Sequence, residues 1–257
     1  MTSPETEREA LTRAQEAFDT GRYRLAAGLW RALQATGRQT YAEALLDRAE
    51  TLQAAQVKLR RRDYQGAARD LAQGAEWADQ YRGALAAVVR ASESLDRGEL
   101  DQAAFEAAES HAFTHAEALV IRGLIHIRAG ETERARSDLE RALELDPEHT
   151  RALTNLGSLD LEGGDPARAG ERFRAAIKID PEYSLPHHNL AVALRRQHKY
   201  GESIRHIKRA QQLDYHRHNV RPSRAGGAPD TSTARPAWRS WLWVAAGAAV
   251  IYFLFIR

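Results

Sequence analysis

The 257-residue sequence contains no cysteine and a single methionine. Without thiols the chain cannot form a disulfide framework, a thiolate metal site or a cysteine nucleophile. The sequence also lacks a glycine-rich phosphate loop, a nucleophile elbow and a zinc-protease motif. These absences predict a protein that binds rather than catalyses, with no cofactor and no resident metal.

The sequence also has no large excess of positive or negative charge. The sequence has 37 Lys and Arg against 35 Asp and Glu, for a net charge of +2. Within residues 1–215 the balance is 31 Lys and Arg against 34 Asp and Glu, so the positive excess lies in the C-terminal part. A body that binds nucleic acid needs a basic stripe. We therefore expect no nucleic-acid partner.

Long hydrophobic runs are absent except at the C-terminus, where residues 241–256 carry no charge. A helix over 238–256 would be about 28 Å long, close to a hydrocarbon core of about 30 Å. Aromatic residues lie near both edges of this segment, as in interfacial belts: Trp238, Trp241, Trp243, Tyr252 and Phe255. The segment 238–257 is thus predicted to be a transmembrane tail anchor. The alternatives are a buried core helix and an amphipathic surface helix.

Residues 216–237 are rich in Pro, Gly and Ser, which predicts a flexible tether spanning about 25 Å on average. Arginines flank the uncharged run 241–256 unevenly: Arg217, Arg221, Arg224, Arg235 and Arg239 precede it and Arg257 follows it. By the positive-inside rule this bias places the N-terminal body in the cytoplasm. The acidic, polar start of the chain is not a secretory signal. Usage of 33 Arg and 4 Lys favours a GC-rich genome and a bacterial inner membrane, with an organelle outer membrane as the alternative.

A repeat is visible around Pro147 and Pro181, which are 34 residues apart. Each lies in a similar phrase, Ala-Leu-Glu-Leu-Asp-Pro-Glu at 142–148 and Ala-Ile-Lys-Ile-Asp-Pro-Glu at 176–182. The alignment superposes small on small and large on large residues, including Gly123 with Gly157, Ala135 with Ala169 and Leu139 with Phe173. A third unit follows with Tyr215 in place of the proline. These units resemble the tetratricopeptide repeat, in which two antiparallel helices bury an apolar stripe against the next unit.

The resemblance implies an all-α fold: a right-handed α-solenoid of about six tetratricopeptide-like helix pairs, plus one C-terminal transmembrane helix. Well-matched units are expected at 116–149, 150–183 and 184–215, and divergent helix pairs at 1–115, where the spacing drifts. A separate helical bundle over 1–115 is the alternative. Gly130 is expected to form a turn between helices, and Asp165 to cap a helix that begins at Pro166.

In tetratricopeptide proteins the first helices of the units line a concave groove that holds a segment of another protein. Carried over by repeat position, the groove residues are Val120, Leu124, Ile127, Arg151, Asn155, Ser158, His188, Asn189, Val192 and Arg195. The first three are apolar and the rest polar or cationic. A segment with an apolar stretch and an acidic end would be complementary to them.

Six of the ten histidines crowd the last repeat and its exit, but only His111 and His115 have the i, i+4 spacing of a helical metal pair. Solvated or packed histidines are expected, and a pH-sensitive surface is the alternative.

Together these features predict a membrane-anchored adaptor that binds protein or peptide segments in its groove and holds them at the cytosolic face of a membrane. The alternative is a self-assembling membrane scaffold in which solenoids stack through the last helix, near Ile204 and Ile207, so that the chain would be oligomeric. A membrane enzyme with a histidine-bound metal is a third hypothesis.

Overall fold

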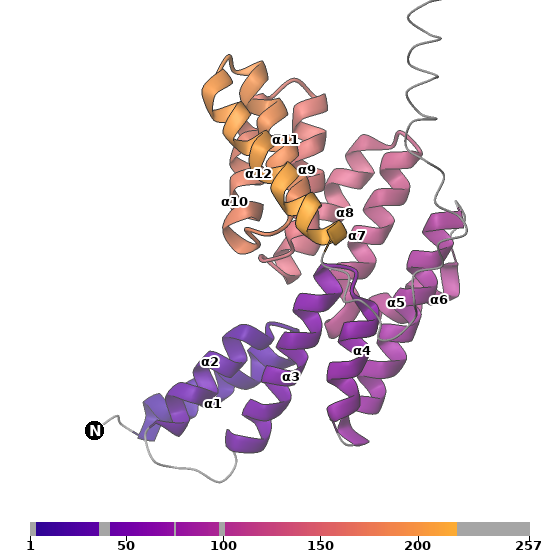
Figure 1. The fold of residues 1–257 in the computed structure, drawn as a ribbon. Helices are drawn as coiled ribbons and strands as arrows, with labels where there is room; N and C mark the ends of the chain where they lie inside the picture. The colour runs from indigo at the N-terminus through magenta and orange to yellow at the C-terminus, as the bar shows by residue number, and fades with distance from the viewer. Residues whose placement is uncertain (1–3, 36–41, 75, 98–100, 220–257) are drawn as a thin grey trace, which may run out of the picture. The chain divides into compact units, whose positions relative to one another are not determined.

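A computed structural model describes residues 4–35, 42–74, 76–97 and 101–219. These ranges contain twelve α-helices, one short 3-10 turn and no strand, which confirms the all-α prediction (Figure 1). Residues 1–216 form one compact unit.

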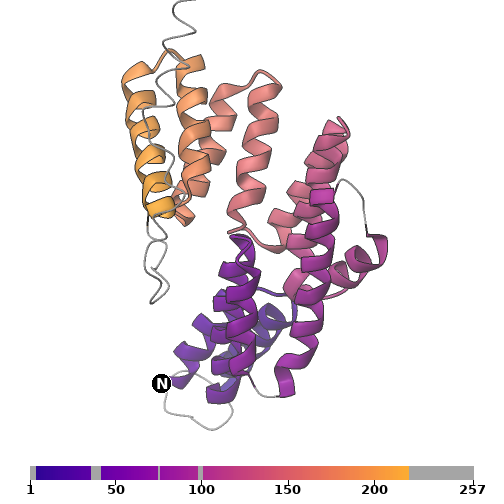
Figure 2. The same ribbon diagram turned by 45° about the vertical axis from the view of Figure 1, so that its right-hand side comes forward.

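The first six helices are α1 (Pro4–Asp19), α2 (Tyr23–Gln34), α3 (Ala42–Arg60), α4 (Tyr64–Gln73), α5 (Asp79–Arg97) and α6 (Gln102–Glu109), with the 3-10 turn at Glu76–Ala78. The last six are α7 (Ala112–Arg128), α8 (Thr132–Leu145), α9 (Thr150–Glu162), α10 (Pro166–Ile179), α11 (Ser184–Arg196) and α12 (Tyr200–Asn219). Figures 1 and 2 show α9 to α12 side by side.

The apolar core runs through the molecule as overlapping clusters. One joins α1, α2 and α3 around Trp30, and the next extends from α2 to α7. Two further clusters link α7 to α9 and α9 to α11, where Phe173 is fully buried. Because the second cluster continues from the N-terminal helices into α7, residues 1–115 do not form a separate bundle.

Small residues allow the close helix approach that the repeat alignment implies. A Cβ atom added to Gly157 would lie 2.6 Å from Cε1 of Phe173, and one added to Gly123 would lie 3.0 Å from Cγ of Leu139. The aligned glycines thus contact the aligned large residues of the following helix in two successive units.

The predicted turn and cap are also confirmed. Gly130 has a φ of +76°, a left-handed value that favours glycine. The Asp165 carboxylate accepts a hydrogen bond from the backbone N–H of Arg168 at 2.9 Å, and Pro166 is the first residue of α10.

Two helix ends differ from the expected unit limits. Helix α7 begins at Ala112 rather than near 116, because the His111 side chain caps it and accepts from the N–H of Phe113 at 3.2 Å. Helix α12 continues to Asn219, past the expected start of the tether at 216, since no proline occurs before Pro222. The predicted anchor at 238–257 lies outside the described residues. None of the helices within those residues is long and apolar enough to cross a membrane.

Candidate functional site

The predicted groove residues meet where α9 and α11 lie next to each other. Ser158 on α9 donates a hydrogen bond to the carbonyl of Thr154 at 3.1 Å and accepts one from the Asn189 amide of α11 at 3.2 Å. Both side chains are half-buried, as is Asn155. The structure therefore brings together side chains that the repeat register placed on one face.

Further along α11, His188 and Arg195 are exposed, and Val192 is half-buried against the core cluster of α9 to α11. Arg195 forms no ion pair with any other described residue. This helix thus presents an apolar contact between two polar side chains, one of them an unpaired cation.

The other groove candidates lie deeper than expected. Val120 is fully buried, and Leu124 and Ile127 pack partly buried against the cores around α7. Arg151 is 8% exposed and pairs with the completely buried Glu117 of α7. Val120 is therefore not open to a ligand in this structure, because it belongs to the core. Arg151 is not open either, because it neutralises the buried carboxylate of Glu117.

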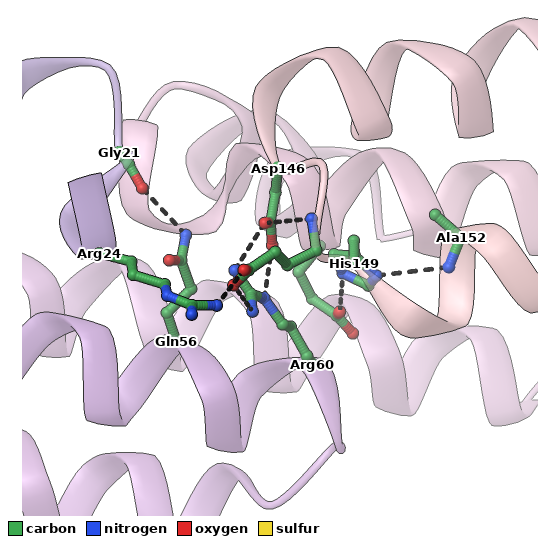
Figure 3. Close-up of polar contacts among 9 residues, drawn as sticks. Gly21, Arg24, Gln56, Arg60, Asp146, His149 and Ala152 are labelled. Carbon is green, nitrogen blue, oxygen red and sulfur yellow. Dashed lines mark hydrogen bonds and ion pairs between the residues drawn. The ribbon is translucent and has the colours of Figure 1, made fainter. Parts of the chain in front are cut away.

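Glu117 and Arg151 occupy the same position in successive repeats, 34 residues apart. The carboxylate of Glu117 also accepts hydrogen bonds from His149 Nε2 at 3.0 Å and from the Tyr64 hydroxyl at 3.2 Å. His149 Nδ1 accepts from the N–H of Ala152 at 3.4 Å, so Nε2 carries the proton donated to Glu117 (Figure 3). A signal for the pair was present in the sequence as opposite charges at equivalent repeat positions.

These contacts fix the charge states of the pair. Burial alone would raise the pKa of Glu117, but Arg151 and the His149 hydrogen bond outweigh it and hold the pKa below its ordinary value. Burial would likewise lower the pKa of Arg151, and Glu117 reverses that effect. The network is an ionised structural element rather than a proton-transfer site.

A second set of contacts joins the N-terminal helices to the Asp-Pro turns of the repeats. Arg60, at the end of α3, binds both carboxylate oxygens of Asp146 through Nε at 2.7 Å and Nη2 at 2.6 Å (Figure 3). Arg61 reaches the equivalent Asp180 at 2.8 Å. Arg24 of α2 pairs with Glu148 in the same turn as Asp146. Consecutive arginines at 60 and 61 gave no sequence signal for these partners.

No group of three or more metal-ligating side chains is positioned to hold an ion within the part of the chain that the structure describes. The His111 side chain caps α7, and Nε2 of His115 lies 3.8 Å from Oε1 of Glu109. The i, i+4 histidines thus face different local partners.

Comparison with known proteins supports the repeat assignment. Residues 122–184 match the tetratricopeptide repeat family profile, which confirms the resemblance over that stretch. No curated protein sequence matches the chain. Among solved structures, a crystal structure of MamA protein is similar at 19% identity and a TM-score of 0.43, covering 70% of this chain and 98% of that chain. A crystal structure of the APC/C hetero-tetramer Cut9-Hcn1 is similar at 16% identity and a TM-score of 0.48, covering 80% of this chain and 46% of that chain. The family match thus identifies tetratricopeptide repeats within residues 122–184.

Proposed function

We propose that this chain is a membrane-anchored adaptor whose repeats bind a protein segment on the face formed by α9 and α11. The observations that carry the binding claim are the Ser158–Asn189 contact and, further along α11, the exposed and unpaired Arg195. Backbone groups of an extended segment can bond to half-buried amides and hydroxyls, and Val192 offers apolar contact.

The ligand chemistry follows from the charge of this face. With Arg151 neutralised by Glu117, Arg195 is the cation left to attract a partner. An acidic residue near an apolar stretch of the partner would complement it, chiefly by steering association and register. We therefore propose a mixed apolar and acidic protein segment as the ligand.

Membrane attachment is the second part of the proposal. It rests on the uncharged run at 241–256 and on the excess of arginine before it. Residues 238–257 would span the bilayer, most readily a bacterial inner membrane, and hold the repeats in the cytoplasm. Alkaline washing of membranes tests this part. The full chain should stay in the pellet, and a chain lacking 238–257 should be released; retention of the shortened chain would refute the anchor.

Affinity capture tests the binding part. The full chain, cross-linked in cells and purified, should retain a protein that the Asn189→Arg variant does not. The matched control is Arg141→Glu in α8, a residue with 62% side-chain exposure. Equal retention by both variants would remove the α9 and α11 face from the binding site.

A second candidate function, self-assembly, is favoured by one observation. Helix α12 exposes Tyr200, Ile204 and Tyr215, which are 56%, 54% and 67% exposed and recur at helical spacing. The end of a solenoid needs either a polar cap or a partner over such a stripe. Sizing the full chain in detergent at two concentrations decides: larger species at high concentration that Ile204→Glu abolishes would support a scaffold, and a constant monomer would exclude it.

A further inference from the structure

A pocket that the proposed function does not use lies between α11 and α12. Its volume is about 410 Å³, and it is lined by His187 of α11 and by Glu202, Arg205, His206 and Arg209 of α12. His187 is buried, whereas Arg205 and Arg209 are exposed. The lining of the pocket thus combines a buried imidazole with exposed guanidinium groups.

The two imidazoles are joined by a hydrogen bond between their Nδ1 atoms at 3.1 Å. Nε2 of His187 lies 3.2 Å from the Pro181 carbonyl, which can only accept, so this nitrogen carries a proton. In the neutral ring Nδ1 of His187 then accepts from Nδ1–H of His206. Nε2 of His206 is left free to take up one proton without breaking the pair.

The charges around the pair are mostly positive and lack partners. Arg205 and Arg209 come from α12 and Arg174 from α10, and Glu202 is the one carboxylate of the lining. None of these three arginines forms an ion pair within the described part of the chain. Three cations against one anion leave an electropositive space that an oxyanion would neutralise.

The protonation of the histidines is tied to that space. Burial lowers the pKa of His187, with Arg209 acting in the same direction against the Pro181 hydrogen bond. Burial also lowers the pKa of His206, and His187, Arg174 and Arg205 add to this while Glu202 opposes it. An anion placed among the arginines would offset their repulsion and favour the charged form of His206.

We propose that this pocket binds the phosphate of an acidic lipid headgroup, and that binding tightens as the pH falls. Guanidinium forks match phosphate oxygens in geometry as well as charge. A lipid source is favoured over a phosphopeptide because α12 leads directly into the arginine-bearing tether before the proposed anchor. A tether of that length spans about 25 Å on average, which would keep the pocket near lipid headgroups. This inference rests on the proposed membrane attachment and adds a second contact to it.

The test uses the full chain in nanodiscs and follows the titration of each histidine by NMR. In discs with about one fifth phosphatidylglycerol, the midpoint of His206 should rise by about half a pH unit or more above its value in phosphatidylcholine discs. The exposed His198 reports the general surface potential and should move less. The Arg205→Gln/Arg209→Gln variant should lose the excess shift of His206.

Three results would overturn the proposal: equal shifts at His206 and His198, an excess shift that survives in the double variant, or a shift caused by an added phosphopeptide but not by phosphatidylglycerol. Inorganic phosphate added to phosphatidylcholine discs separates the sources. If it alone shifts His206, the pocket takes a soluble phosphate and the lipid claim fails. Failure of the anchor would show differently, as a chain that does not enter discs of either lipid.

Discussion

Arg60 and Asp146 form a two-bond ion pair between the end of α3 and the turn that precedes α9, 86 positions apart in the sequence. Both side chains are largely buried, at 10% and 6% exposure. With Arg61 on Asp180, the pair places the α3–α4 turn against the Asp-Pro turns of two successive repeats. The N-terminal helices are thereby held against the repeats that carry the proposed binding face.

Replacing Arg60 by Ala should destabilise the protein by about 3 kcal/mol or more, because Asp146 would remain buried without its countercharge. Urea denaturation followed by circular dichroism measures the change. Arg134→Ala is the control, since Arg134 is 72% exposed and solvent screens its pair with Glu131, so that its loss should change the stability little. Equal effects of the two substitutions would show that the Arg60 pair does not hold the helices together.

Glu117→Gln should also destabilise the fold at neutral pH, by about 3 kcal/mol, because Arg151 loses its buried partner. The folded pKa of Glu117 lies below the ordinary value of 4.5, so its stabilising effect is complete above that value and is lost as the pH falls through the folded pKa. The variant should therefore lose less stability than the wild type on acidification below about pH 4.5.

Urea midpoints at neutral and acidic pH measure this difference. Glu133→Gln, at an exposed position of α8, should keep the acid dependence of the wild type. An unchanged acid dependence in Glu117→Gln would contradict the role of the buried network.

Gly157→Ala should cost about 1–3 kcal/mol, because the new methyl would lie 2.6 Å from the Phe173 ring and force α9 and α10 apart. Gly28→Ala is the matched control in α2, where no atom lies within 4 Å of an added Cβ. That change should stabilise the protein by about 0.5–1 kcal/mol, since alanine is more favourable than glycine in a helix interior. Thermal melting distinguishes them, and a shift of the same sign in both would refute the close packing.

Arg195→Glu should weaken binding of the captured partner segment about tenfold, because it reverses the unpaired cation of the proposed face. Isothermal titration calorimetry measures the affinity, with the exposed Arg141→Glu as control. Arg151→Glu should instead destabilise the fold, since it would place two buried carboxylates together. An affinity that Arg195→Glu leaves unchanged would place the acidic part of the ligand elsewhere.

Local features of this fold were predictable from the sequence, and long-range ones were not. The 34-residue period placed Gly123 and Gly157 at equivalent positions of close helix approach, and the Asp165–Pro166 pair predicted the start of α10, because such signals act within one or two neighbouring helices. The same register assigned Arg151 to the groove, since the register gives the face of a helix but not the depth of a side chain. The contacts of Arg60 and Arg61 depend on how distant repeats meet, which no local pattern encodes.

If this chain holds a protein partner at a membrane, the location of that partner should depend on residues 238–257. The most direct measurement is the share of the captured partner found in the membrane fraction of cells that express either the full chain or a chain lacking 238–257. The partner should move to the soluble fraction with the shortened chain while still co-purifying with it. A partner that stays in the membrane fraction, or that no longer binds the shortened chain, would contradict membrane recruitment by this chain.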